Sequence, residues 1–512
     1  MSIFSCLLSC ATPALLAIAV AWYIHKMIAR KGQPPGPIGL PVVGNLPTIW
    51  QNKRFRDALS KMRKNYGDIF QLQMGYQPAT VVLNKSSLVR DAFKCNEFSS
   101  RPKSNLAKIL VDAGERNIIF ADGERWKLCR KLANRGLGIF TTAKNSKLEP
   151  NLYIISDWLI KKFTETPGES VTTKQPFIQA TAAMMSSIIF GNDPNPDEQF
   201  NQELIEYVKT FTAGFENIQL MELFPFAECA FGKQKSEIEN MMQNFVRHIR
   251  AELAKHRYTG DVRTIADSLS KATEEITEDE KRAAGITNEE IRETAIELFD
   301  AGFFTTQENL EWMFLLLACH PEVQKKAQDE IDKKLSDNQK PTIKDDWQRL
   351  HYCRAVVTET LRWASDFGGT IPHLVSKDTE LAGYVIPEGT QVIANLYAIN
   401  HDPEEFPDHN CFKPERFLRD DGCFNQELSE KVLSFSVGKR RCPGEQLAKN
   451  ELFLFLVYIA DRLNIRLDLT SFDRNPLCGG KPNFTFMPGP HRLYFTPRDG
   501  KKTLLDYATS IF

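Results

Sequence analysis

The longest regular pattern of apolar and polar positions predicts one continuous helix between Thr287 and His320. The run Thr287-Asn288-Glu289-Glu290 has the form of a capping box, in which a threonine and a glutamate three residues later satisfy free N–H groups at a helix start. No proline follows before Pro321, so we expect about thirty helical residues, roughly 45 Å at 1.5 Å per residue. A helix of that length crosses a whole domain.

Most of the remaining chain also has helical periodicity, with breaks at Pro167-Gly168, from Asn192 to Pro196 and at Gly260. A further helix is expected from His351 to Trp363. Strands are predicted where short apolar runs are bounded by turn residues. These runs are IFQLQM (69–74) and ATVVLN (79–84), joined through Gly75-Tyr76 and followed by a helix; Tyr384–Ile386 and Gln391–Ile393, separated by Pro387-Glu388-Gly389; and Asn483–Met487 and Arg492–Phe495, a second hairpin signal around Pro488-Gly489-Pro490. The predicted class is mainly α with small β-sheets, an α+β fold.

The amino-terminal run 4–24 is apolar and uncharged, which predicts a transmembrane helix ahead of that fold. Lys26, Arg30 and Lys31 follow it, and no charged residue precedes it. The positive-inside rule then places the amino terminus in the lumen and the rest in the cytoplasm. A cleaved signal peptide is the alternative, and it fits less well because the run is long and no A-x-A site is evident.

The run Pro34 to Pro41 cannot propagate a helix and predicts a stiff hinge. The expected division is an anchor (1–33), a Pro-rich hinge (34–46) and a catalytic domain (47–512). With 512 residues, of which 42% are hydrophobic, the chain can bury a large core. A net charge of −1 gives no reason to expect nucleic acid. The eleven cysteines form no CxxC pair and the nine histidines no cluster, so neither a disulfide framework nor a zinc site is expected.

The stretch from Phe435 to Gly444 carries the strongest chemical signal. A thiolate that binds haem iron needs a loop whose backbone approaches the porphyrin, and Gly438 and Gly444 lack a Cβ. Arg440 is a fixed cation suited to a haem propionate. Taken alone, a cysteine such as Cys442 is more often a small buried hydrophobe.

The pattern F-x-x-G-x-R-x-C-x-G, formed by Phe435, Gly438, Arg440, Cys442 and Gly444, resembles the signature loop of the cytochromes P450. The sequence PPGPxGLPxxGNL also resembles the hinge of microsomal animal members. The resemblance extends over residues 34–498. It implies the cytochrome P450 fold and a haem b whose iron takes Cys442 as its axial thiolate, with the five loop residues contacting the cofactor.

Two further stretches resemble the family's propionate-binding segments. Trp126 and Arg130 lie at i, i+4, where a surface cation–π pair is the ordinary reading. The resemblance to WxxxR makes them haem contacts instead. His373, in Thr370-Ile371-Pro372-His373, is implied to donate to a propionate; the alternative is a surface histidine.

The middle of the long helix, Asp300 to Thr306, resembles the oxygen-binding segment A/G-G-x-D/E-T. Ala301 and Gly302 are small enough to let a flat ligand approach, and both are expected to contact the cofactor. Thr305 is implied to be the catalytic hydroxyl that directs protons during oxygen activation. Taken alone, Ala-Gly in a helix more often means close helix packing.

The chain departs from this segment at Phe304, where the family has an acid. Asp300 precedes Phe304 by one turn and lies on nearly the same face. We therefore treat Asp300 as a second catalytic candidate, which either delivers protons through water or binds a polar group of the substrate. A solvated aspartate on the far side of the helix is the alternative.

Glu359 and Arg362 resemble the family's ExxR pair, and Arg416 lies in the sequence Pro414-Glu415-Arg416-Phe417. The resemblance implies an ion network among the three beneath the haem, with a structural role. The basic residues near the haem motifs could form a docking face for an acidic flavoprotein, although such charges are more often merely solvated. They are Lys127, Lys131, Lys439, Arg441 and Lys449.

Together the motifs imply a monooxygenase of the endoplasmic reticulum membrane, single-pass, with its catalytic domain in the cytoplasm. It would insert one atom of O2 into a sterol, fatty acid or xenobiotic, with electrons from NADPH-cytochrome P450 reductase and cytochrome b5 as a further partner. The pocket is expected to draw on 103–118, Thr212–Phe226, Phe303 or Phe304, Ile371 and Phe484–Phe486. Two rivals remain, a reductase-independent isomerase or dehydratase of lipid hydroperoxides and a membrane-tethered haem sensor.

Overall fold

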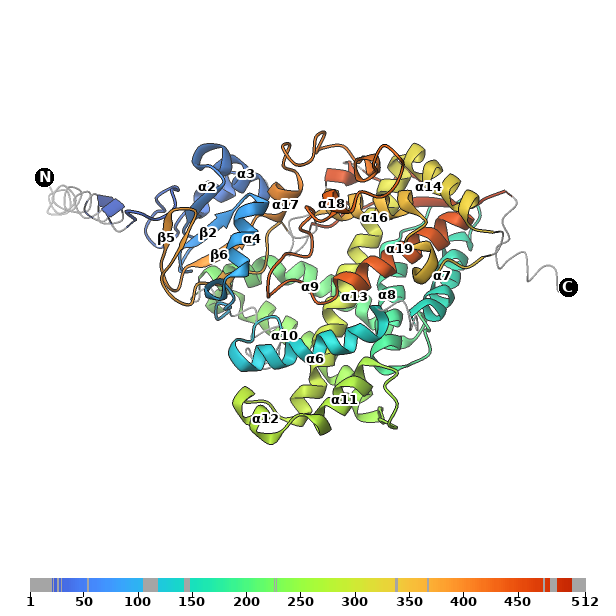
Figure 1. Cartoon of the computed structure of the whole chain (residues 1–512), viewed down its shortest axis with the longest axis horizontal. Helices are drawn as coiled ribbons and strands as arrows, with labels where there is room; N and C mark the ends of the chain where they lie inside the picture. The colour runs from blue at the N-terminus through green and yellow to red at the C-terminus, as the bar shows by residue number, and fades with distance from the viewer. Residues whose placement is uncertain are drawn as a thin grey trace, which may run out of the picture.

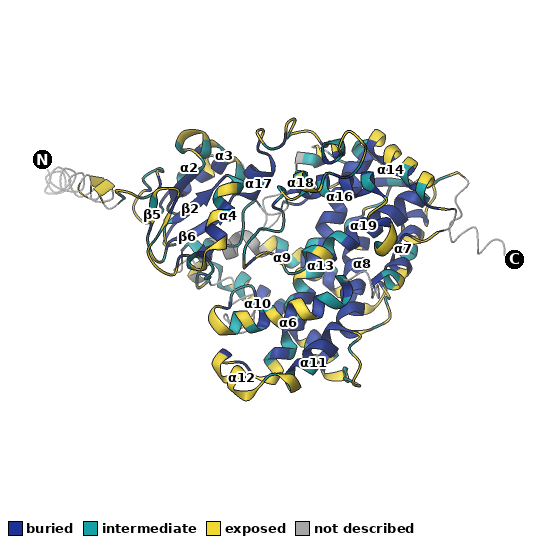
Figure 2. Ribbon diagram, viewed as in Figure 1, coloured by how far each residue is buried: buried dark blue, intermediate teal, exposed yellow. Residues whose placement is uncertain are grey.

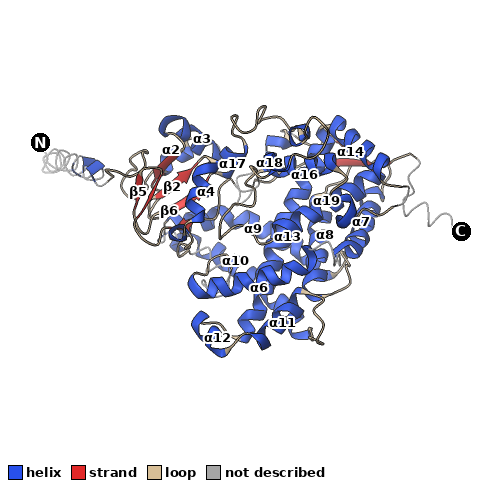
Figure 3. Ribbon diagram, viewed as in Figure 1, coloured by secondary structure: helices blue, strands red, loops and turns tan. Residues whose placement is uncertain are grey.

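The protein is mainly helical with small β-sheets, as the sequence predicts (Figure 3). The structure is a computed structural model that describes residues 21–499, apart from 22, 25–26, 29, 53–54, 105–117, 142–147, 225, 227, 337–338, 366–367, 473–474 and 479–485. The larger sheet lies toward the amino-terminal end of the molecule, and the long helices fill the other side (Figure 1).

The helices follow the predicted breaks, since none runs through Pro167-Gly168, 192–196 or Gly260. The first half of the chain forms α2 (Leu46–Trp50), α3 (Phe55–Tyr66), α4 (Ser86–Lys94), η1 (Asn96–Phe98), α6 (Gly123–Thr141), α7 (Leu148–Thr164), α8 (Lys174–Phe190), α9 (Gln199–Leu223) and α10 (Glu228–Lys255). The second half forms α11 (Ile265–Glu275), α12 (Glu278–Ala284), α13 (Asn288–Cys319), α14 (Pro321–Lys334), α15 (Ile343–Asp346), α16 (His351–Ala364), α17 (Leu396–Asn400), η3 (Pro414–Phe417), α18 (Gln426–Ser429), α19 (Glu445–Arg462) and η4 (Pro476–Cys478).

The four-stranded sheet has the order β1-β2-β6-β3, and two two-stranded sheets pair β4 with β5 and β7 with β8. The strands are β1 (Ile69–Leu72), β2 (Thr80–Leu83), β3 (His373–Leu374), β4 (Thr379–Leu381), β5 (Tyr384–Ile386), β6 (Gln391–Ala394), β7 (Leu463–Leu467) and β8 (Leu493–Pro497). The predicted pair at 69–84 is confirmed, because β1 and β2 are antiparallel with Ile69 opposite Leu83, and α4 follows.

The second hairpin signal lies partly outside the described residues. The run Arg492–Phe495 does contribute to a strand, but β8 pairs with β7, so that Leu493 lies opposite Leu467. Its proposed partner falls largely in 479–485, outside the described residues. The turn residues at 488–490 predicted a local reversal, whereas the partner strand was chosen by packing of distant segments, which local turn chemistry does not encode.

Helix α13 confirms the predicted long helix and crosses the centre of the molecule (Figure 1). It has 32 residues, and its capping box is present: Thr287 Oγ1 accepts from the Glu290 N–H at 3.2 Å, and Glu290 Oε2 accepts from the Thr287 N–H at 2.8 Å. From Phe303 onward the helix is buried on almost every side (Figure 2). A helix that is apolar around its circumference is typical of a core element.

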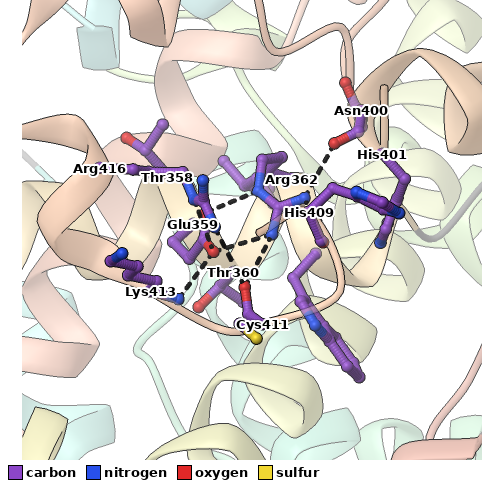
Figure 4. Close-up of polar contacts among 12 residues, drawn as sticks. Thr358, Glu359, Thr360, Arg362, Asn400, His401, His409, Cys411, Lys413 and Arg416 are labelled. Atoms are coloured by element: carbon purple, nitrogen blue, oxygen red, sulfur yellow. Dashed lines mark hydrogen bonds and ion pairs between the residues drawn. The ribbon is translucent and has the colours of Figure 1, made fainter. Parts of the chain in front are cut away.

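The predicted ExxR network is confirmed and lies wholly inside the fold (Figure 4). Arg362 donates to both oxygens of Glu359, at 2.6 and 2.8 Å, and Arg416 Nε lies 3.2 Å from Glu359 Oε1. The Glu359 and Arg362 side chains have no exposed surface. Arg362 also donates to the carbonyls of Asn400 and His409, at 2.9 and 3.0 Å, so α16 holds the irregular chain between α17 and η3.

This network reaches the loop that carries Cys442 through Asn400. Asn400 Oδ1 accepts the Leu433 N–H at 2.9 Å, and its amide donates to Ser434 Oγ at 3.3 Å. The Ser434 hydroxyl in turn donates to the Leu361 carbonyl at 2.7 Å. The start of the cysteine loop is therefore fastened to α16, the helix that carries the ion network.

No helix in the part of the chain that the structure describes is long and apolar enough to cross a membrane. The predicted span 4–24 lies mainly outside the described residues.

Glu359→Gln should lower the free energy of unfolding by about 3–5 kcal/mol, because it leaves the Arg362 guanidinium buried without its carboxylate. The measurement is urea unfolding followed by circular dichroism. Asp279→Asn is the control, since Asp279 pairs with Arg282 on an exposed helix and should leave the urea midpoint unchanged. Equal midpoints for the two variants would contradict a stabilising role for the network.

Candidate active site

The loop before α19 is closed by its own backbone. The Cys442 N–H donates to the Phe435 carbonyl at 2.9 Å, and the Arg441 N–H to the Gly438 carbonyl at 3.3 Å. Two residues have left-handed backbone, Ser436 with φ +59° and Gly438 with φ +79°. The predicted loop thus forms a tight fold-back that presents Cys442 at its end.

The structure constrains the two loop glycines differently. A Cβ on Gly438 would lie 2.1 Å from the Phe93 carbonyl oxygen, so glycine lets the loop press against α4. A Cβ on Gly444 would lie 3.9 Å from the Cys442 sulfur, which is ordinary contact. The requirement at Gly438 therefore comes from Phe93 and from its positive φ. The assignment of both glycines to the cofactor stays a prediction.

The Cys442 sulfur lies at the amino-terminal end of α19, where free N–H groups stabilise negative charge. Burial raises the pKa of the Cys442 thiol, while hydrogen bonds from the backbone of Gly444 and Glu445 and the charge of Arg130 lower it. The net pKa shift is upward because burial is the largest cause. Cys442 keeps accessible surface in the structure.

A stripe of accessible residues runs through the centre of α13, and it consists of Glu297, Asp300, Ala301 and Thr305. The opposite face of the helix is fully buried. The Thr305 hydroxyl donates to the Ala301 carbonyl at 2.8 Å, which leaves its oxygen free to accept on the stripe side. Ala301 and Thr305 therefore share a face, as the sequence predicts.

Two chains of contacts lead from α13 to the cysteine loop and its neighbour α19. Thr306 Oγ1 lies 3.4 Å from Glu451 Oε2 on α19, the helix that begins after Cys442. Glu297 Oε2 accepts the Ile118 N–H at 2.5 Å, and the Ile118 carbonyl accepts from Arg440 at 3.3 Å. Helix α13 is thus connected both to the cysteine loop and to the helix that follows it.

Gly302 faces away from the stripe. A Cβ there would come within 2.5 Å of Met185 Cε on α8, so the small residue lets α13 and α8 approach closely. This is the packing role that Ala-Gly has most often. Contact of Gly302 with a cofactor stays a prediction that this geometry does not favour.

The Arg440 guanidinium is buried and fully engaged. It donates to the carbonyls of Ser99 and Ala121 at 2.8 and 2.7 Å, pairs with the carboxylate of Asp122 and lies 4.0 Å over the Trp126 ring. The cation–π partner of Trp126 is therefore Arg440, from a distant segment. Arg130 instead donates to the Arg441 carbonyl, which ties α6 to the cysteine loop.

Arg101 belongs to the same cluster, and the sequence reasoning missed it. Its guanidinium donates to the carbonyls of Ile119, Ile371 and Pro372 at 2.9–3.0 Å. Burial, with repulsion from Arg440, lowers the pKa of Arg101 to about 9, so it stays charged at neutral pH. No motif marks this arginine, and only the position of the 118–122 segment brings it to Arg440.

His373 is buried, so the surface alternative is wrong. Its ring stacks on Phe93 at 3.8 Å, and its Nδ1 lies 2.6 Å from the Phe98 carbonyl, which can only accept. Nδ1 therefore carries the proton. Burial, followed by repulsion from Arg101 and Arg440, holds the pKa of His373 well below its usual range. Donation from Nε2 to a carboxylate requires a second proton, which nearby negative charge would stabilise.

Arg101 and Arg440 give positive charge to a buried cluster that also contains the neutral His373. Of the described residues, one carboxylate balances it, Asp122, whose side chain is 41% exposed. A buried excess of cations calls for anionic partners. The two propionates of a haem, held next to a cysteine sulfur at a helix start, satisfy that chemistry, so the residues fit the expected cofactor.

Asp300 does not point into solvent on the far side of the helix. Its Oδ1 accepts from the Tyr207 hydroxyl at 2.9 Å, which joins α13 to α9. Burial raises the pKa of Asp300 to about 6, against the opposing effect of the Tyr207 hydrogen bond. Phe304 packs edge-on against Phe211 of α9 at 6.0 Å. Both residues therefore face α9, as their i, i+4 spacing predicts.

The remaining predicted residues are partly placed. Lys127, Lys131, Lys439 and Arg441 are exposed, and Lys127 and Lys449 pair with Glu124 and Glu445. In the expected pocket, most of 103–118 and residues 484–485 lie outside the described residues. The Phe486 ring stacks on Trp312 at 5.2 Å, and Phe226 is exposed.

Comparison with known sequences gives a consistent result. The family "Cytochrome P450" matches residues 34–494. Cytochrome P450 1A1 of Canis lupus familiaris is 30% identical over 479 residues, covering 90% of this chain and 90% of the relative. The Cavia porcellus protein of the same name is 31% identical, with coverage of 85% and 88%, and the Homo sapiens one is 30% identical, with 87% and 89%.

Gly438→Ala should destabilise the cysteine loop, because alanine at positive φ costs about 1–2 kcal/mol before the clash with Phe93 is counted. Gly444→Ala is the matched control, since its Cβ meets the sulfur only at contact distance. The measurement is the urea midpoint of each variant. A Gly438→Ala midpoint as high as that of Gly444→Ala would show that the contact with Phe93 does not constrain the loop.

Proposed function

Because the chain belongs to the cytochrome P450 family of haem-thiolate monooxygenases, we propose that it inserts one oxygen atom from O2 into a lipophilic substrate, using electrons from an NADPH-dependent reductase. The observation that carries this proposal is the meeting of a cysteine sulfur at a helix start with the cationic cluster of Arg101, His373 and Arg440. Haem bound there supplies the iron centre that activates dioxygen.

The proposed cofactor contacts are those of the cysteine loop and its neighbours. Cys442 would hold the iron through its sulfur, with hydrogen bonds from Gly444 and Glu445 that withdraw charge from the sulfur. Arg440, His373 and Arg101 would bind the propionates, with Trp126 and Arg130 behind them. Ala301 gives the flat ring room on the α13 side.

Thr305 is the proposed proton-directing hydroxyl. Its hydrogen bond to the Ala301 carbonyl fixes the side chain against the helix, and its oxygen stays on the accessible stripe. A hydroxyl held in this way can accept one hydrogen bond and pass its own proton onward. This is the role that its motif implies, performed by an atom whose position is fixed.

Asp300 has two proposed roles, and the geometry favours the second. It precedes Thr305 by five residues, which places the two side chains roughly 140° apart around the helix at 3.6 residues per turn. Its hydrogen-bond partner is Tyr207, on a different helix from Thr305. Contact with a polar group of the substrate fits this placement better than direct proton delivery to the Thr305 side.

The proposed setting is the endoplasmic reticulum membrane, with a single amino-terminal anchor (1–33), the hinge (34–46) and a cytoplasmic catalytic domain (47–512). The apolar run 4–24 and the basic residues after it support this placement. The exposed basic residues near the cysteine loop support docking of NADPH-cytochrome P450 reductase, and of cytochrome b5, on that side.

A reductase-independent isomerase or dehydratase of lipid hydroperoxides is the second candidate. One observation favours it: the family's acid position holds Phe304, whose ring is packed against Phe211 and cannot relay a proton. The accessible Thr305 hydroxyl favours the monooxygenase.

The deciding experiment is reconstitution with the reductase, a sterol and fatty-acid mixture and isotopically labelled dioxygen, with products read by mass spectrometry. We expect labelled products that require NADPH. The Cys442→Ser variant, which replaces the thiolate with a poor iron ligand, should form none. Unlabelled, rearranged products from added hydroperoxides, formed without NADPH, would establish the isomerase instead.

The roles of Thr305 and Asp300 can be distinguished by measuring the fraction of consumed NADPH that ends in product. Thr305→Ala should lower the fraction of NADPH that ends in product, by roughly tenfold if the hydroxyl acts in proton transfer. Asp300→Asn should leave that fraction unchanged on a neutral substrate. An equal fall of this fraction in both variants would show that Asp300 takes part in proton delivery.

A further inference from the structure

The accessible stripe of α13 carries two carboxyl groups, neither of which lies within ion-pair distance of a cation among the described residues, although the charge of Arg125 acts on Glu297. Asp300 is joined to Tyr207, and Glu297 accepts the Ile118 N–H at 2.5 Å. The pKa of Glu297 is raised far above its usual range, first by burial and also by the charge of Asp300. Glu297 therefore serves the backbone, whereas Asp300, whose pKa of about 6 lies below neutral pH, carries a negative charge beside Tyr207.

The hydrogen bond from Tyr207 satisfies only part of what a buried carboxylate needs. A carboxylate offers about four acceptor sites, and the described residues supply one donor, to Oδ1. Burying a charge in a largely apolar site is unfavourable unless a counter-charge or several hydrogen bonds compensate. Asp300 nevertheless keeps accessible surface on the stripe, where a ligand can reach it.

Aromatic rings pack around Tyr207, the hydrogen-bond partner of this carboxylate. Tyr207 lies 5.1 Å from Phe245 and 6.0 Å from Phe303, and Phe211 lies 6.0 Å from Phe304. The faces of such rings attract cations, and their bodies bind hydrocarbon. A negative charge close to phenyl rings therefore favours a ligand that is hydrophobic over most of its length and carries one positive charge.

We propose that the pocket above Ala301 takes lipophilic amines, whose ammonium group binds Asp300 beside Tyr207 while the hydrocarbon body lies on Phe304 and Phe211. This proposal rests on the proposed function, since it names the substrate class of the same site. It narrows the expected sterols, fatty acids and xenobiotics to compounds with a basic nitrogen near an aromatic or aliphatic body. Fatty acids are disfavoured, because their carboxylate would face Asp300.

The test is equilibrium dialysis of the haem-loaded protein at pH 7.4 with two naphthalene probes of the same shape. N,N-dimethyl-2-(2-naphthyl)ethylamine is cationic at this pH, and 2-(3-methylbutyl)naphthalene replaces its nitrogen with carbon. We expect the amine to bind about ten- to a hundredfold more tightly, as a charge-assisted hydrogen bond in a buried site implies. Equal binding of the two probes would overturn the proposal.

Two variants separate charge from structure. Asp300→Asn removes the charge but keeps an oxygen that can accept from the Tyr207 hydroxyl, whereas Tyr207→Phe removes this hydrogen bond and keeps the charge. Asp300→Asn should abolish the preference for the amine and leave binding of the hydrocarbon unchanged. Tyr207→Phe should keep the preference. Loss of amine binding in both variants alike would mean that the pair is structural, and the proposal would fail.

Probe binding is measured without turnover. A failure of the amine proposal can therefore be distinguished from a failure of the proposed monooxygenase function. Asp300-dependent amine binding without labelled product would leave the anchor standing and reject the monooxygenase. Labelled lipid products with no preference for the amine would do the reverse. A third probe, 2-(2-naphthyl)ethanol, gives one more check: if it binds as tightly as the amine and needs Asp300, the site reads a hydrogen-bond donor and not a positive charge.

Discussion

A carboxylate with no exposed surface, Glu359, fixes the part of the molecule that everything else rests on. It binds two arginines from segments more than fifty residues apart, and Arg362 also donates hydrogen bonds to backbone carbonyls. Ion pairs buried this deeply add little net stability compared with apolar packing, but each partner makes the others obligatory. The network thereby gives one fixed position to a long irregular segment, and through Asn400 to the start of the loop that ends in Cys442.

The site uses the same physical device in a different setting. Around Glu359 two arginines share one carboxylate that has no exposed surface, whereas Arg101 and Arg440 have Asp122, whose side chain is 41% exposed, and Asp300 on α13 has a tyrosine hydroxyl as its partner. A fold can keep such incompletely paired charges where a ligand of opposite sign completes them. The charges of the site therefore indicate two kinds of ligand group, an anionic one beside the arginines and a cationic one beside Asp300.

What the sequence could predict follows from how local the cause is. The capping box at Thr287, the strands at 69–84 and the length of α13 depend on neighbouring residues, and all are confirmed. The ExxR network was predicted because short motifs contain its members, Glu359 and Arg362 in one and Arg416 in another. The pairing of β8 with β7, the stacking of Trp126 under Arg440 and the presence of Arg101 in the cluster depend on segments brought together by the whole fold. Gly438 shows the same limit: its motif position was evident, but the carbonyl of Phe93 that demands a glycine was not.

Two hydrogen bonds connect Glu297 to Arg440 through Ile118. Through the N–H and the carbonyl of this one residue, they join the wall against which a substrate would lie to the cluster that would hold the cofactor. Whatever shifts the Glu297 carboxyl also shifts the carbonyl that Arg440 holds. Linkage requires the reverse as well: if filling the pocket tightens the grip on the cofactor, then binding of the cofactor must strengthen the pocket's affinity by the same free energy.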